Sequence, residues 1–209
     1  MTDDEIRSRL DRVYAALGDT RSRPEDIPVQ VVNQGTSYGF VQDFTGGRSA
    51  AQHQKDLASV INEIMGIRDR ARRWLKANGS DAAKVDVFIK SELTVSLVHD
   101  LANADKHGGA GRDTMSGIQA KLKDVSRGMS IAWDPVKGQF ATSGQFMAPA
   151  VNFQKGATSG QATSSNLEIG LTGWVVDGQG KEICQVQRLI PDAIYKWEQF
   201  LRSNGLILS

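Results

Sequence analysis

Residues 174–186 read Trp-Val-Val-Asp-Gly-Gln-Gly-Lys-Glu-Ile-Cys-Gln-Val. The turn residues Asp177-Gly178-Gln179-Gly180 lie between two runs of apolar and β-branched side chains, a pattern typical of a β-hairpin. Upstream, apolar residues alternate in 118–122, 129–133 and 167–171, which indicates further strands. The second half of the chain therefore predicts an antiparallel sheet.

A polar segment, 135–167, interrupts these strands. It carries only two charged side chains, Lys137 and Lys155, among many Gly, Ser, Thr, Gln and Ala residues. We expect exposed antiparallel strands at its edges and a poorly ordered loop over 156–165. A sheet that binds an oligosaccharide or a peptide, built on 135–176, is one hypothesis that this composition allows.

The first residues predict a helix and then a connector. Thr2 and Glu5 have the spacing of a capping box, and the apolar residues behind them keep a helical period until Gly18. Val29, Val31 and Val32 suggest a short strand. The glycine-rich residues 33–47 are predicted to be a connector with aromatic anchors.

Two long helices should follow. Ser49 and Gln52 form a second capping box, and a helical period continues from there to Asn78-Gly79. A further helical stretch extends from Asp81 to Gly108, with a break near Ser91. The short turn between these stretches predicts antiparallel packing. A last helix is expected to close the chain, with Pro191 at its first position.

This order of elements indicates an α+β fold, because helices precede strands and do not alternate with them. We expect an N-terminal helical hairpin packed with a C-terminal antiparallel sheet and a closing helix. Three regions follow: 1–47 with the first helix, short strand and connector, 48–109 with the helical hairpin, and 110–209 with the β region and final helix. One compact domain should contain all three.

Composition limits the class of protein. The 209 residues include 25 Lys and Arg against 24 Asp and Glu, with 40% hydrophobic residues, as in an ordinary globular protein. No apolar run approaches the roughly 20 residues of a membrane span. The N-terminus is acidic, unlike a signal peptide, and Cys184 is the only cysteine. A cytoplasmic protein without a disulfide, a metal or a cofactor is the expectation.

One segment, 99–108, contains several side chains that can take part in acid–base chemistry or hydrogen bonding. On a helix, Asp100, Asn103 and His107 would share one strip, flanked by His99 and Lys106. A carboxylate and an amide can orient an imidazole, and the imidazole can move a proton. Asp100, Asn103, Lys106 and His107 are therefore the candidate catalytic residues. Alternatively, the same side chains cap a helix end, where positive charge is favourable.

A basic run near the end of the first long helix is a candidate nucleic-acid surface. Arg68, Arg72 and Lys76 would share a face, with Arg73 beside them, and such a stripe can contact phosphates. A solvated helix face would show the same run. The nearly neutral net charge argues against strong nonspecific binding to nucleic acid but permits a local patch.

Two resemblances follow from these residues. Asp43-Phe44-Thr45-Gly46-Gly47, the helix with Trp74 and the run Asp100-Leu101-Ala102-Asn103-Ala104-Asp105-Lys106-His107-Gly108 resemble a group of uncharacterised bacterial proteins. The likeness covers roughly residues 40–110 and, more loosely, the C-terminal helix with Trp197. The group implies no particular activity.

The second resemblance is to the HEPN superfamily, helical proteins that include metal-independent ribonucleases of toxin and antiviral systems. Asn103 and His107 resemble the Asn and His of its motif, while Ala102 stands where the arginine belongs. The run from Arg48 to His53 also matches the spacing of arginine and histidine. The resemblance implies that Arg48 would contact a phosphate and His53 would act on a ribose hydroxyl.

The leading prediction is a binding or interaction protein of a bacterial or phage conflict system. Its helical hairpin would present the cluster of 99–108 to a partner protein or ligand. The alternative is a HEPN-like ribonuclease, in which a homodimer would bring two clusters together and RNA would be the partner. The ribonuclease needs an exposed histidine beside a cation, whereas the binding protein permits buried histidines.

Overall fold

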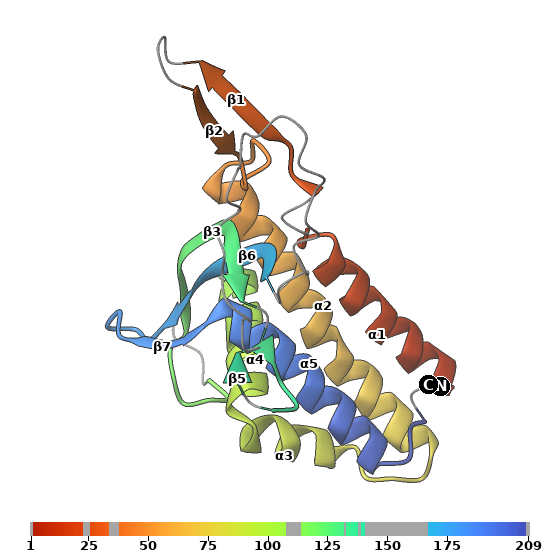
Figure 1. Ribbon diagram of the computed structural model, residues 1–209. Helices are drawn as coiled ribbons and strands as arrows, with labels where there is room; N and C mark the ends of the chain where they lie inside the picture. The colour runs from red at the N-terminus through yellow and green to blue at the C-terminus, as the bar shows by residue number, and fades with distance from the viewer. Residues whose placement is uncertain are drawn as a thin grey trace.

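Figure 1 shows the computed structural model of the chain. It describes residues 2–22, 26–33, 38–107, 114–131, 133–137, 139–140 and 167–207. Within these residues the helices come mainly first, a three-stranded antiparallel sheet follows, and a helix closes the chain. The protein therefore has the expected α+β fold.

The helices of the first half form where the periodicity predicts them. They are α1 (Asp3–Gly18), α2 (Ala50–Ala77), α3 (Ala83–Ser91) and α4 (Leu93–His107). Both capping boxes are present, at Thr2 with Glu5 and at Ser49 with Gln52. The break expected near Ser91 falls at Glu92, whose extended backbone separates α3 from α4.

The main sheet has the strand order β3-β6-β7. Its strands are β3 (Lys121–Ile131), β6 (Leu167–Val176) and β7 (Glu182–Gln185), and both pairings are antiparallel. The predicted hairpin turn is confirmed: Asp177 accepts hydrogen bonds from the backbone N–H groups of Gln179 and Lys181 at 2.9 Å each.

A bulge in β3 bends this sheet. The register with β6 shifts between Lys123 and Ser126, and Asp124 adopts a positive φ of 53°. On the facing strand, Gly173 has a φ of +151°, and an added Cβ would lie 3.1 Å from the Lys123 carbonyl oxygen. Only glycine fits this close approach of the two strands.

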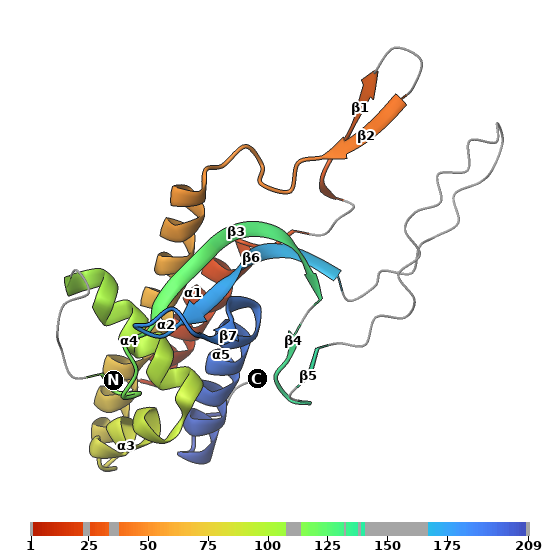
Figure 2. The same cartoon turned by 90° about the vertical axis from the view of Figure 1, so that its left-hand side faces the viewer.

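The connector predicted over 33–47 is wrong in part, because it contains a strand. β1 (Val29–Asn33) pairs antiparallel with β2 (Tyr38–Gln42), with Val31 opposite Phe40. We call this pair the ribbon. Its Val, Tyr and Phe residues favour extended structure more strongly than the glycines of this segment oppose it. In both views the ribbon projects away from the helices and the main sheet (Figures 1 and 2).

The closing helix begins earlier than Pro191 predicts. α5 (Val186–Ser203) includes Pro191 inside the helix. The proline removes one backbone hydrogen bond, but the preceding turn contributes the buried side chains of Val186, Leu189 and Ile190. Burying each such side chain stabilises the fold by about 1.5–3 kcal/mol, which outweighs the lost bond.

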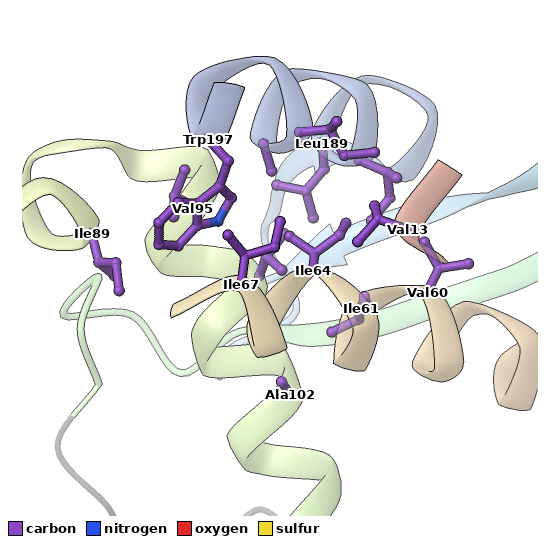
Figure 3. Close-up of a cluster of buried hydrophobic side chains, with 14 of the residues drawn as sticks. Val13, Val60, Ile61, Ile64, Ile67, Ile89, Val95, Ala102, Leu189 and Trp197 are labelled. Carbon is purple, nitrogen blue, oxygen red and sulfur yellow. The ribbon is translucent and has the colours of Figure 1, made fainter. Parts of the chain in front are cut away.

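The core lies between α2, α4 and α5, with α1 and the sheet covering its sides. Figure 3 shows Ile64, Ile67 and Leu189 directed toward one another, with Trp197 beside Val95. Phe88 of α3 packs against Trp197 and Phe200 of α5, with ring centroids 5.0 and 4.4 Å away. The apolar stripes read from the sequence are therefore largely the buried faces, although Tyr14 and Leu93 of these stripes are 46% and 53% exposed.

The polar segment is described only at its edges. β4 (Trp133–Asp134) and β5 (Gln139–Phe140) form a short antiparallel pair, as expected for its start. The loop predicted over 156–165 lies outside the described residues. None of the helices in the described part of the chain has the length and apolar character needed to cross a membrane.

Candidate functional site

The cluster predicted from 99–108 lies on α4 where this helix packs against α2. His99 and Asp100 turn inward and are only 6% and 5% exposed. Asn103 is half-buried, and Lys106 is exposed. The strip predicted on one helix face is thus divided between the interior and the surface.

Asp100 ties α4 to the segment that leads into the sheet. One carboxylate oxygen accepts from the Met115 backbone N–H at 2.8 Å, and the other accepts from the Ser116 backbone N–H at 2.9 Å and the Ser116 hydroxyl at 2.6 Å. Burial acts to raise the pKa of Asp100, but hydrogen bonds from His99, Ser116 and Met115 outweigh it and hold the pKa below its ordinary value. Asp100 is therefore an ionised acceptor whose two oxygens are both used.

His99 lies between a guanidinium and an amide. Its Nε2 is 3.3 Å from Nη1 of Arg68, and its Nδ1 is 3.1 Å from the side-chain amide of Asn103. Arginine can only donate, so Nε2 is the acceptor and the ring proton of the neutral tautomer sits on Nδ1. That proton faces Asp100 Oδ1 at 3.6 Å. Both ring nitrogens of His99 are occupied within the protein.

Asp86 of α3 neutralises two of the predicted phosphate-binding arginines. Its Oδ1 accepts from Nε and Nη2 of Arg68 at 3.1 and 2.9 Å, and its Oδ2 lies 3.4 Å from Nη1 of Arg72. The chain of contacts Arg72–Asp86–Arg68–His99 thus links α2, α3 and α4. Sequence reasoning missed Asp86, because the predicted antiparallel packing does not show which carboxylate of the second stretch meets the arginines of α2.

The exposed end of α4 is held to α2 by weaker contacts. Lys106 Nζ lies 3.6 Å from the Met65 sulfur, and the Asn62 side-chain amide donates to Asp105 at 3.5 Å. His107 is the last residue of α4, and its side chain lies outside the described part of the structure. The glycine-rich residues 108–113 that follow it lie outside as well.

The two residues of the alternative pair differ in burial, because Arg48 is exposed and His53 is buried. Both terminal nitrogens of Arg48 lie 3.0 Å from the Asp56 carboxylate. His53 is 2% exposed, and neither ring nitrogen has a hydrogen-bond partner among the described residues. An exposed histidine beside a cation, which the ribonuclease hypothesis requires, does not occur among the side chains that the structure describes. Ala102, at the position of the missing arginine, is fully buried in the core (Figure 3).

The remaining candidates lie apart from this cluster. Arg73 and Lys76 are exposed near the end of α2. Burial raises the pKa of the Cys184 thiol, so it is a poor nucleophile at neutral pH. Trp74 and Trp197 are buried in the core, as their apolar surroundings predict. No group of three metal-ligating side chains occurs within the described ranges.

Ser116 is the second residue that sequence reasoning missed. Its hydroxyl donates to Asp100, and it also accepts from the Ile118 backbone N–H at 3.1 Å. The run Thr114-Met115-Ser116-Gly117 has the composition of a turn, which was the available signal. The Asp100 carboxylate holds this turn in place through these hydrogen bonds.

Comparisons with protein-family models, curated proteins and solved structures find no significant match to this chain.

Proposed function

We propose that this chain is a protein-binding module and that its ribbon is the contact surface. The ribbon itself carries the proposal. It stands away from the helices and the main sheet in two perpendicular views (Figures 1 and 2), and among the described strands β1 and β2 pair only with each other. Both strands therefore have an outer edge without a strand partner in the described part of the chain.

The sequence of the ribbon supports this role. Residues 28–42 contain no charged residue, whereas Val, Tyr and Phe recur along both strands. A two-stranded ribbon is marginally stable alone in water. Natural proteins protect such edges with lysine, proline or a bulge, and β1 and β2 have none of these. An extended segment of another protein can complete the ribbon by adding a strand.

The polar cluster supports a binding protein over an enzyme. His99, Asp100 and Arg68 use their hydrogen-bonding groups to hold α2, α3, α4 and residues 115–116 together. A general acid or base must reach its substrate within hydrogen-bond distance. The conflict-system setting and the HEPN likeness stay predictions from resemblance.

Affinity capture tests the ribbon directly. The bait is the whole chain, as wild type, as Phe40→Lys in the ribbon, and as Val87→Lys, which changes a valine that is 68% exposed on α3. We expect one co-purifying protein that wild type and Val87→Lys recover equally and Phe40→Lys loses about tenfold or more, as when a central interface anchor is removed. Equal recovery by Phe40→Lys would contradict the proposal.

A cleavage assay on labelled structured RNA without added metal tests the alternative. Wild type is compared with His107→Ala, Asn103→Ala and His53→Ala, all purified identically. We expect the four samples to be indistinguishable. Cleavage that disappears in one variant would instead establish a ribonuclease and identify its helix.

A further inference from the structure

A second feature of the molecule, independent of the ribbon, is a half-buried arginine on β3, Arg127, which has no acidic partner among the described residues. The Arg127 guanidinium donates from Nη2 to the Ser22 hydroxyl at 2.5 Å. Its Nε is buried and has no hydrogen-bond partner in the part of the chain that the structure describes. No ion pair between described residues includes Arg127. By contrast, Arg9, Arg48 and Arg68 each pair with a carboxylate.

The surroundings of Arg127 hold the guanidinium in place. Ser22 is fixed by a backbone bridge to Ile169 of β6, with hydrogen bonds of 2.7 and 2.8 Å. On the other side, an ideal Cβ on Gly46 would lie 3.4 Å from Nη1 of Arg127, and Gly46 has a φ of +61°. Glycine at this position therefore leaves the space that the guanidinium occupies.

The turn beside Arg127 contains a carboxylate, Asp43, but this carboxylate accepts hydrogen bonds from the turn itself. The carboxylate of Asp43 accepts from the backbone N–H groups of Thr45 and Gly47 and from the Thr45 hydroxyl. The hydrogen bonds from Thr45 come first among the causes that lower the pKa of Asp43. Asp43 thus serves its own turn. Residues 45–47 are exposed, so the Nη1 side of the guanidinium, next to Gly46, lies close to solvent.

Burial of a guanidinium is costly without a counter-charge. The Nε–H and one terminal N–H of arginine form the fork that a carboxylate or phosphate accepts through two oxygens. In Arg127 the Nη2 group of this fork donates to the neutral Ser22 hydroxyl, and the Nε–H has no acceptor among the described residues. From this geometry we propose that Arg127, Ser22 and the turn at Gly46 form a binding site for an oxyanion of the carboxylate or phosphate class.

Nuclear magnetic resonance of arginine Nε–H groups tests this site in the whole chain. The Arg127 signal is identified by its loss in Arg127→Lys, a variant that keeps the charge but lacks the fork. Inorganic phosphate and, in a separate arm, acetate are titrated at constant ionic strength with chloride as the balance. We expect the Arg127 signal to shift saturably with one or both anions, and the two arms distinguish phosphate from carboxylate.

Two controls keep the test decisive. Arg12 is exposed on α1, so Arg12→Lys should leave the anion affinity unchanged, whereas Gly46→Ala should weaken it about tenfold by displacing the turn. The wild-type titration stands even if Gly46→Ala does not fold. An Arg127 signal that does not respond, or that responds no more than the Arg12 signal, would overturn the proposal.

Discussion

The end of α4 and the ribbon differ in their charged residues and in the partners that they have within the protein. Around α4, the polar groups of His99, Asp100 and Arg68 all have partners within the protein. The ribbon contains no charged residue, and its two strands pair only with each other among the described strands. A segment can therefore be rich in side chains capable of acid–base chemistry and still leave none of them free to contact a substrate or a partner. A dense polar motif can be an internal clamp, whereas an uncharged segment can be the surface left for a partner.

The largest expected effect comes from Asp100→Asn. This change replaces one acceptor oxygen by an amide donor that would face the N–H or hydroxyl groups of Met115 and Ser116. We expect the free energy of unfolding to fall by about 2–3 kcal/mol, the range for a buried charged hydrogen-bonding group. Denaturant titration measures it, with Asp105→Asn as the exposed control. Equal loss in both variants would show that Asp100 is not a clamp.

A smaller loss is expected at the ion pairs of Asp86. Arg68 contacts Asp86 through two nitrogens with its side chain 22% exposed, while Arg72 makes one contact at 3.4 Å and is 43% exposed. Arg68→Ala should cost about 1–2 kcal/mol of unfolding free energy, and Arg72→Ala less than about 0.5 kcal/mol. A double-mutant cycle with Asp86→Asn isolates the pairs. No coupling between Arg68 and Asp86 would contradict this ranking.

Acid should weaken the clamp gradually. The pKa of Asp100 in the folded protein lies below its ordinary value, so its stabilising contribution is present above the unfolded pKa and is lost as pH falls through the folded pKa. We therefore expect the stability gap between wild type and Asp100→Asn to be constant near neutrality and to narrow in acid. Unfolding titrations from neutral to acidic pH measure this difference in stability. A difference that grows in acid would contradict the predicted direction of the pH dependence.

His53→Leu should have a small effect of the opposite sign. His53 is buried, and neither of its ring nitrogens has a partner in the described ranges. An apolar side chain removes the cost of desolvating these two nitrogens. We expect a gain of about 1 kcal/mol in unfolding free energy, seen as a higher midpoint of thermal unfolding. A loss of stability would show that the imidazole has a partner in solution.

Local sequence patterns predict much of this fold. The capping boxes at Thr2 and Ser49 and the turn at Asp177 depend on neighbouring residues, so spacing alone locates them. The start of α5 predicted from Pro191 is wrong, because burial of the preceding turn stabilises the helix more than the proline destabilises it. The strand Tyr38–Gln42 was missed for a similar reason, since its glycine-rich flanks hide the pairing with Val29–Asn33.

The sequence predicts only part of the candidate site. Spacing places Asp100 and Asn103 on one strip of a helix, but it cannot show which side of that strip meets the core. The contacts with Arg68, Asp86 and Ser116 join four segments that are distant in sequence. Tertiary packing thus decides that His99 and Asp100 point inward, and no local pattern contains that information.

Native-state hydrogen exchange of the free chain tests the contrast between the two regions most directly. The amides of Met115 and Ser116 donate to Asp100, so we predict that they exchange nearly as slowly as the amides of α4. The amides of β1 and β2 should exchange at least about a hundredfold faster, because an unsupported ribbon opens locally. Fast exchange at Met115 and Ser116, together with a strongly protected ribbon, would contradict both the clamp and the proposed binding surface.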